Sequence, residues 1–152
     1  MRQNFFITKI NENAVVPKRA TKKSAGLDLV AAITEPITLN PFERVLVPTG
    51  IKAIGPSGFH IEIRPRSGLA IKHGVTVLNT PGTIDEDYND EIKVILVNLS
   101  LEPYIINPGD RVAQMILVPV SLMAPIEVSE EQFNNFFEID KSRIGGFGST
   151  GK

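Results

Sequence analysis

The segment 79–93 places several carboxylates and one tyrosine between two β-rich stretches, 74–78 and 91–99. Pro, Gly, Asn and Asp suffice for a tight turn, and a tyrosine among acidic residues is not needed for one. The pattern therefore predicts a tight turn that also forms part of a functional site. Asp85 lies on the strand side of this bend, where a carboxylate can point into a cleft and activate water as a general base. The alternative is a solvated acidic turn. A calcium loop is disfavoured, because the later bidentate glutamate and the flanking helices of an EF-hand are missing.

A second candidate site for chemistry is 64–70, which reads Arg-Pro-Arg-Ser-Gly-Leu-Ala. It joins an alternating strand to a short expected helix, 67–73. The start of a helix exposes unpaired N–H groups and a positive dipole end, which suit phosphate. With the guanidinium of Arg66 and the hydroxyl of Ser67 added, the segment becomes an anion-binding turn. The alternative is that Ser67 serves only as the N-cap.

Two weaker signals come from polar residues next to strands. Asp28 follows Gly26 at the expected start of a strand, where it either binds a ligand or hydrogen-bonds a turn. Gln114 interrupts an apolar run, which predicts a hydrogen-bond partner or a water for its amide. Asp110 and Arg111, at the start of the same run, can form an ordinary exposed ion pair.

The end of the chain, 145–151, reads Gly-Gly-Phe-Gly-Ser-Thr-Gly. An aromatic ring among so many glycines is unusual for a linker, where Gly and Ser suffice. A glycine-rich strip lets backbone N–H groups approach phosphates while Phe147 covers a base. We therefore expect 141–152 to be a flexible tail that closes over a ligand; a disordered terminus is the alternative.

The elements that must position these residues are mostly strands. In 59–64 apolar and polar residues alternate with period two, and 44–51, 91–99 and 111–120 are rich in Val, Ile and Leu and bounded by turn signals. Only 67–73 and 129–137 are typical of short helices. The pattern predicts an all-β sandwich or barrel forming one domain over 1–152.

Composition narrows the class of protein. The chain has 152 residues, 42% of them hydrophobic, which is enough for a buried core. A net charge of −1 gives no reason to expect a nucleic-acid partner. The absence of cysteine excludes disulfides and thiolate chemistry. No apolar stretch reaches the length of a membrane span and no signal-peptide core is present, so we expect a cytoplasmic protein without a membrane partner.

Five segments taken in order, from 24–26 to the glycine-rich tail that ends at Gly151, resemble those of the trimeric deoxyuridine triphosphate nucleotidohydrolases, the dUTPases. The match spans nearly the whole chain and is especially close in 64–70 and 145–151. The resemblance implies a jelly-roll-like β fold and a homotrimer whose active sites are shared between subunits. It also implies Mg²⁺-assisted hydrolysis of dUTP to dUMP and pyrophosphate, which limits uracil incorporation into DNA and supplies dUMP for thymidylate synthesis.

The resemblance also implies roles for single residues. Asp85 corresponds to the base that activates the attacking water at the α-phosphate, and Gln114 to a residue that orders this water or the phosphate. Tyr88 corresponds to the ring against the deoxyribose, and Asp28 to a carboxylate that touches the water shell of Mg²⁺ while the phosphates hold the ion. The remaining substrate-binding positions are Arg66, Ser67 and Gly68 for phosphate, Asn79, Gly82, Thr83, Ile84 and Lys93 for the base pocket, and Arg143, Phe147, Gly148 and Ser149 for the closing tail.

Two departures from the family pattern stand out. After Tyr88 the family usually has Arg-Gly, whereas this chain has Asn89 and Asp90. In the tail a single residue separates Arg143 from the glycines, so the family arginine position falls on Ser142. Two other functions stay open: a related dCTP deaminase, with or without diphosphatase activity, and a regulatory module that binds nucleotide without turnover. Asp85 at the position that activates water favours the diphosphatase.

Overall fold

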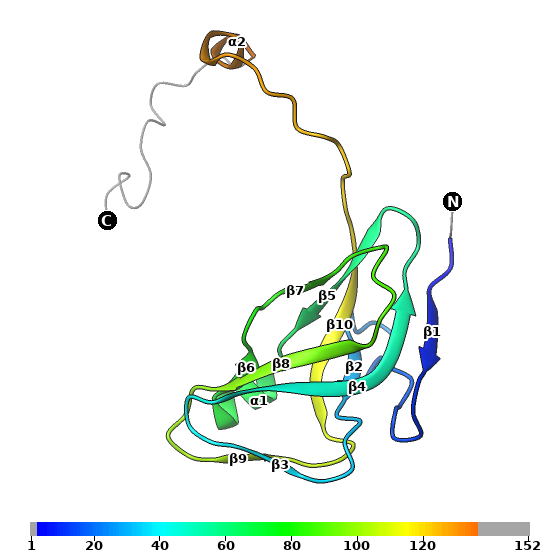
Figure 1. Cartoon of the computed structure of the whole chain (residues 1–152), viewed down its shortest axis with the longest axis vertical. Helices are drawn as coiled ribbons and strands as arrows, with labels where there is room; N and C mark the ends of the chain where they lie inside the picture. The colour runs from blue at the N-terminus through cyan, green and yellow to red at the C-terminus, as the bar shows by residue number, and fades with distance from the viewer. Residues whose placement is uncertain (1–2, 137–152) are drawn as a thin grey trace. The chain divides into compact units, whose positions relative to one another are not determined.

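The computed structural model describes residues 3–136, which fall into two units. The first ends at Ser121 and the second begins at Leu122. The first unit is built almost entirely of strands (Figure 1), so the prediction of a jelly-roll-like all-β fold with very short helices is confirmed. Within residues 3–136 no helix is long and apolar enough to cross a membrane.

Two four-stranded antiparallel sheets make up most of the first unit. One has the strand order β1-β4-β8-β6 and the other β2-β10-β5-β7, while β3 and β9 pair separately. The strands are β1 Phe6–Lys9, β2 Leu27–Val30, β3 Ile37–Leu39, β4 Arg44–Ile54, β5 Phe59–Arg64, β6 Val75–Val77, β7 Gly82–Ile84, β8 Ile92–Asn98, β9 Tyr104–Ile106 and β10 Arg111–Pro119. The connections cross between sheets, so residues distant in sequence become neighbours.

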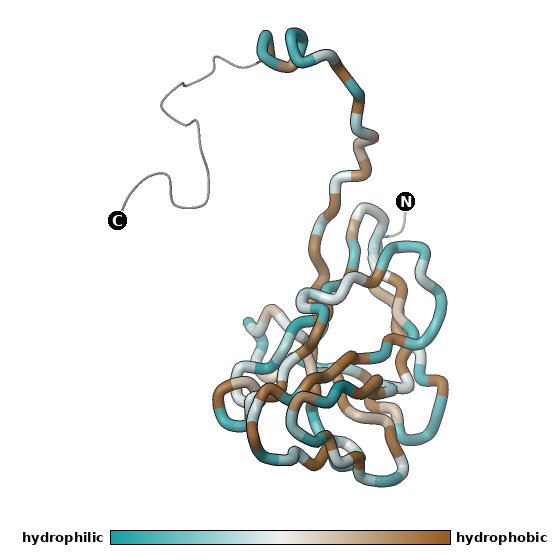
Figure 2. The backbone as a smooth tube through the Cα atoms, turned by 60° about the vertical axis from the view of Figure 1, so that its left-hand side comes forward, coloured by the Kyte–Doolittle hydropathy of each residue, from teal (hydrophilic) through white to brown (hydrophobic). Residues whose placement is uncertain are grey.

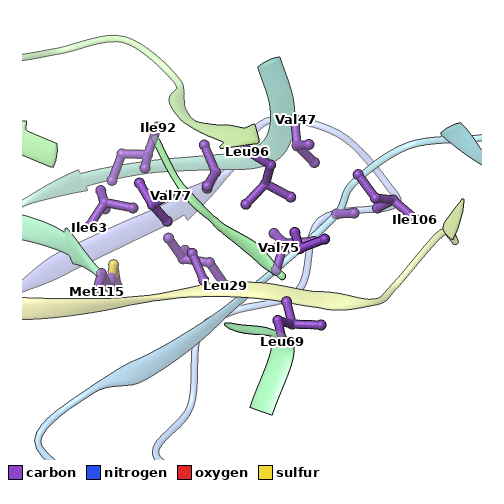
Figure 3. Packing of buried hydrophobic residues seen from close by; sticks show 14 of the residues in the cluster. Leu29, Val47, Ile63, Leu69, Val75, Val77, Ile92, Leu96, Ile106 and Met115 are labelled. Atoms are coloured by element: carbon purple, nitrogen blue, oxygen red, sulfur yellow. The ribbon is translucent and has the colours of Figure 1, made fainter. Parts of the chain in front are cut away.

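The core consists of aliphatic side chains from both four-stranded sheets. Fully buried members include Val47 and Leu96 from one sheet and Leu29 and Met115 from the other (Figure 3). Figure 2 shows hydrophobic segments running through the interior of this unit and hydrophilic ones in its outer loops. Because side chains alternate along a regular strand, a residue that follows a core residue points to the outer face of its sheet, except at the register shift in β10, where Val112 and Ala113 are both buried.

This alternation decides where the polar candidates lie. In β5, Ile61 and Ile63 belong to the core, so Glu62 and Arg64 point to the outer face. The helix α1, Ser67–His73, follows β5 at once and has the predicted bounds. The prediction that Ser67 caps this helix is wrong: Arg66 occupies the N-cap position without a side-chain cap bond, and Ser67 is the first helical residue.

The prediction of one tight turn across 79–93 is also wrong. Residues 82–84 form the strand β7, which within residues 3–136 pairs with β5 and with no other strand, so β7 is an edge of its sheet. The strand β7 forms because it pairs with β5, which lies earlier in the chain. The sequence around 82–84 gives no sign of this pairing. The segment is therefore a bend, a short edge strand and a loop rather than a hairpin turn.

The second unit contains one short helix, α2, Glu130–Asn135. Ser129 caps it, and the Gln132 side chain accepts from the Ser129 N–H in return, forming a capping box. Its described apolar side chains are exposed, among them Leu122, Met123 and Ile126. That 1–152 forms a single domain stays a prediction.

Candidate active site

A pocket of about 350 Å³ lies beside β7. It is lined by five of the predicted substrate-binding residues, Asn79, Gly82, Thr83, Ile84 and Lys93, together with Tyr88. Leu46, Ile63 and Ile95 complete its apolar wall. The sequence analysis missed these three, because periodicity tells which face of a strand is apolar but not which cavity that face borders.

The pocket wall includes the free edge of β7. Only one side of this strand pairs with β5, so alternate residues of 82–84 direct their N–H and C=O groups away from the sheet. Gly82 is buried here, and a Cβ at its position would lie 3.3 Å from Asn79 Nδ2 and 3.3 Å from Ile63 Cβ. A side chain at this position would therefore crowd the pocket.

The loop after β7 is stabilised by hydrogen bonds between its own residues. Tyr88 donates its hydroxyl to the Glu91 carbonyl at 2.8 Å and its N–H to the Asp85 carbonyl at 3.2 Å. Asp85 directly follows the last residue of β7 and is exposed. Within residues 3–136 its carboxylate makes no hydrogen bond or ion pair. It is therefore available to bind a water or a ligand at the end of the strand.

Three charged groups and one amide form a second cluster at the outer face of the β2-β10-β5-β7 sheet, which we call the arginine cluster: Asp28, Arg66, Arg111 and Gln114. Asp28 Oδ1 lies 3.4 Å from Arg66 Nε, and Asp28 Oδ2 lies 3.3 Å from the Arg111 guanidinium. One negative charge faces two positive charges, so the cluster carries a net charge of +1. The excess positive charge makes it suitable for an anion.

Backbone bonds fix the positions of the cluster members. Gln114 lies opposite Asp28 in the register of β10 and β2, and it donates its amide to the Pro65 carbonyl at 3.0 Å. Arg66 donates to the Arg111 carbonyl at 3.1 Å. The predicted partner for Gln114 is thus confirmed.

The predicted ion pair between Asp110 and Arg111 is wrong. Asp110 accepts from the backbone N–H and the side chain of Asn107, so its carboxylate turns back into the preceding turn. Arg111 reaches Asp28 on the neighbouring strand instead. The prediction missed Arg111 as a member of the cluster, because the pairing of β10 with β2 is not encoded near either residue.

The pocket and the arginine cluster have no residue in common, and the pocket also takes Leu46, Lys93 and Ile95 from the β1-β4-β8-β6 sheet. The pocket takes Ile63 and Ile84 from the side that faces the core, whereas Asp28 and Gln114 lie on the outer side. Within residues 3–136 no hydrogen bond or ion pair joins the two groups. Ser67 and Gly68 are exposed at the start of α1, next to Arg66, and a Cβ at Gly68 would meet nothing within 4 Å.

The family model of the dUTPases matches residues 12–151. The chain belongs to the dUTPase family. The deoxyuridine 5'-triphosphate nucleotidohydrolase of Fusobacterium nucleatum is 50% identical over 143 residues, covering 93% of this chain and 92% of its own. The protein of the same name from a Hydrogenobaculum species is 51% identical over 146 residues, covering 96% of each chain.

Solved dUTPase structures have the same fold. The dUTPase of Staphylococcus bacteriophage 80alpha, solved with dUpNHpp, superposes with a TM-score of 0.84 at 24% identity and covers 99% of each chain. The dUTPase of Staphylococcus aureus phage phi11, described with a structural Mg(II) ion, has a TM-score of 0.77 at 24% identity, covering 84% of this chain and 98% of its own. At this identity the likeness concerns the fold.

Family membership leaves the individual site residues as predictions. The predicted dUTPase tail residues Arg143, Phe147, Gly148 and Ser149, and the tail 141–152 as a whole, lie outside the described residues. The departure at Asn89 and Asp90 does lie within them. Asp90 accepts the Glu91 N–H at 2.7 Å, and this hydrogen bond, followed by the attraction of Lys52, holds the pKa of Asp90 below its usual value.

Proposed function

We propose that the protein hydrolyses dUTP to dUMP and pyrophosphate. The observation that carries the proposal is a pocket with the free backbone edge of β7 in its wall, Tyr88 in its lining and the unpaired carboxylate of Asp85 at the end of the strand. Its family and its relatives named deoxyuridine 5'-triphosphate nucleotidohydrolase support the same activity.

The pocket is suited to a uracil ring. Uracil offers an acceptor–donor–acceptor edge, which the free N–H and C=O groups of β7 can match, while Ile63, Ile84 and Ile95 supply apolar contact. Cytosine changes that edge and would leave buried groups unpaired, which costs binding strongly. Tyr88 is the group that packs against the deoxyribose, leaving no room for a ribose hydroxyl. A pocket wall packed against C5 would likewise exclude thymine.

The arginine cluster is the phosphate side of the site. Arg66, with the hydroxyl of Ser67 and the first N–H groups of α1, binds the triphosphate, because these donors lack partners inside the helix. Gln114 orders the attacking water or the α-phosphate. The net positive charge of the cluster offsets part of the charge on the phosphates.

Asp85 acts as the general base. It accepts a proton from a water whose oxygen attacks the α-phosphorus, and the bond from that phosphorus to the bridging oxygen breaks. Pyrophosphate leaves with the electron pair, and dUMP remains. Because little covalent chemistry falls to the protein, alignment and electrostatics supply most of the rate.

The described residues fit Mg²⁺ as a partner of the substrate rather than of a protein cage. Within residues 3–136 no three His, Cys, Asp or Glu side chains gather to hold a metal. Mg²⁺ commonly keeps several waters and takes phosphate oxygens. Asp28 is the one carboxylate of the arginine cluster and would contact the water shell. When bound, the ion would neutralise charge on the phosphates.

We further propose a homotrimer in which one active site combines the pocket of one subunit with the arginine cluster of another. Two observations support it: within residues 3–136 the two regions share no residue, hydrogen bond or ion pair, and the apolar side chains Leu122, Met123 and Ile126 are 77%, 86% and 85% exposed. Exposed apolar side chains of this kind mark a protein–protein interface, and their burial against a second copy would stabilise the oligomer. Sedimentation equilibrium should give three times the chain mass.

The activity is tested by product analysis. The protein is incubated with Mg²⁺ and, separately, with dUTP, dCTP, dTTP or UTP, and the products are identified. We expect dUMP and pyrophosphate from dUTP alone, and no turnover when the metal is chelated. Ammonia released from dCTP would establish a deaminase instead, and tight dUTP binding without products would establish a nucleotide-binding module.

A further inference from the structure

Glu91 fixes the loop 85–93 through contacts of both its side chain and its backbone. Its side chain is only 13% exposed. One carboxylate oxygen accepts the Gly50 N–H at 2.8 Å, and the other lies 3.6 Å from Lys93 Nζ. Glu91 therefore links the long strand β4 to a lysine in the pocket lining.

The backbone of Glu91 holds the pocket tyrosine. Its carbonyl accepts the Tyr88 hydroxyl at 2.8 Å, while its N–H donates to the Asp90 carboxylate at 2.7 Å. The side chain, the N–H and the carbonyl of this one residue are thus all engaged. The position of the Tyr88 hydroxyl depends directly on where the Glu91 peptide is fixed.

The anchor at Gly50 is rigid. Gly50 has φ +64°, and it lies where the pairing of β4 and β8 shifts register between Pro48 and Ile51. A Cβ at Gly50 would lie 2.6 Å from Ala14 Cβ, so the backbone there is closely packed. The neighbouring Thr49 is fully buried. An N–H group fixed in this way determines the position of any carboxylate that accepts from it.

We propose that Glu91 is a positioning residue that holds Tyr88 and Lys93 in the pocket wall and, through Tyr88, sets the discrimination between deoxyribose and ribose. The second part rests on the proposed function, in which Tyr88 contacts the sugar. Glu91 itself lies outside the pocket lining and makes no substrate contact in this account.

A carboxylate suits this position better than an amide does. Glu91 faces one neutral donor, the Gly50 N–H, and one ammonium group, that of Lys93. A glutamine can still accept from Gly50 but loses the charge that attracts Lys93. Alanine loses both contacts. Glu91→Gln and Glu91→Ala therefore separate the anchoring of the loop from the attraction of the lysine.

The first experiment follows Tyr88 without using activity. The chain has two tyrosines and no tryptophan, so in a Tyr104→Phe background Tyr88 is the only tyrosine fluorophore. We expect Glu91→Ala to raise the acrylamide quenching constant of Tyr88 about twofold, because the ring loses its fixed tether. Glu91→Gln and the control Asp87→Ala should leave it unchanged.

The second experiment measures kcat/KM for dUTP and for UTP. We expect Glu91→Ala to lower the ratio of kcat/KM for dUTP to kcat/KM for UTP about tenfold. This is the usual effect of losing one hydrogen bond to a charged group, here the bond from the Gly50 N–H to the Glu91 carboxylate. Glu91→Gln should keep the ratio within about twofold and raise KM for dUTP through Lys93. Tyr88→Phe, which removes only the hydroxyl, should lower the ratio in the same direction.

The outcomes separate the two proposals. If the parent protein turns over no dUTP, the proposed function and the sugar discrimination fail together, while the quenching data still decide whether Glu91 holds Tyr88. If Glu91→Ala changes neither the quenching nor the dUTP:UTP ratio, the positioning role is overturned. If Glu91→Ala does not fold, an unchanged ratio in Tyr88→Phe overturns it.

Discussion

The pocket beside β7 and the arginine cluster are built in opposite ways. Most of the pocket comes from one continuous segment, 79–95, whose polar groups bond to each other and leave a backbone edge free. The cluster gathers Asp28, Arg66 and Gln114 from distant parts of the chain and leaves an excess of positive charge. A region with a free edge selects by shape and hydrogen bonding, whereas a region with excess charge binds phosphate of any nucleotide. We therefore propose that the pocket gives specificity for the base and that the arginine cluster gives affinity for the triphosphate.

The largest effect on activity should come from Asp85, the proposed general base, which directly follows the pocket strand β7. Asp85→Asn keeps the size of the side chain and removes the base, so we expect kcat for dUTP to fall by about 10²–10⁴-fold. Binding of dUMP, measured by calorimetry, should change by about twofold at most, because the free edge of β7 is untouched. Retention of more than a tenth of the parent kcat would show that Asp85 is not the base.

A smaller loss is expected from the arginine cluster. Arg66→Ala removes the guanidinium that faces Asp28, and we expect kcat/KM for dUTP to fall about 100-fold. Binding of deoxyuridine, which has no phosphate, should stay the same. Arg64→Ala is the matched control, because Arg64 is the last residue of β5, two positions before Arg66, and pairs with Glu62 instead. Equal losses from the two variants would remove Arg66 from the phosphate site.

Gly26 tests how closely the cluster is packed. A Cβ at this position would lie 2.2 Å from Gln114 Oε1, so Gly26→Ala must push the Gln114 side chain away from Pro65. We expect a loss of about 1–3 kcal/mol in unfolding free energy and about tenfold in kcat. In the double variant with Gln114→Ala the kcat losses should not add, because both changes remove one contact. Full additivity in kinetic assays would contradict this.

The smallest effect concerns pH and lies on the outer face of β5. The Arg64 side chain donates to Glu62 at 2.7 Å and, as the main cause, lowers the pKa of Glu62 from 4.5. A carboxylate with a lowered folded pKa stabilises the protein above its unfolded pKa, and this contribution disappears as pH falls through the folded value. Glu62→Gln should therefore unfold at lower denaturant than the parent at pH 7, and the difference should shrink as pH falls below 4.5 and through the lowered folded pKa of Glu62. A constant difference down to pH 2 would contradict the role of the ion pair.

Local patterns in the sequence predicted the local structure well. The alternation in Phe59–Arg64 gave the strand β5 with its correct bounds, and Ser67–His73 is the helix α1. The short segment 82–84 was missed as a strand, because it is stabilised by pairing with β5 rather than by its own composition. The resemblance to the dUTPases gave the pocket residues within 79–93. Leu46, Ile63 and Ile95 were not predicted, because they reach the pocket only through the folding of other strands against β7.

The arginine cluster was predicted residue by residue but not as a cluster. Asp28, Arg66 and Gln114 each had an alternative structural explanation in the sequence, and only the register of β2, β10 and β5 brings them together. Arg111 was paired with the wrong carboxylate, because an adjacent residue in sequence is not the nearest partner when the strand directs them to different sides. Strand register is the information that local reading lacks.

The central claim is that one active site needs the pocket of one subunit and the arginine cluster of another. It is tested most directly by co-expressing Asp85→Asn and Arg66→Ala chains with different tags and assaying dUTP hydrolysis by the purified mixed trimers. In a cyclic trimer that contains both chain types, one of the three sites combines an intact pocket with an intact cluster, so about a third of parental activity should return. Activity no greater than that of the two variants alone would contradict the shared site.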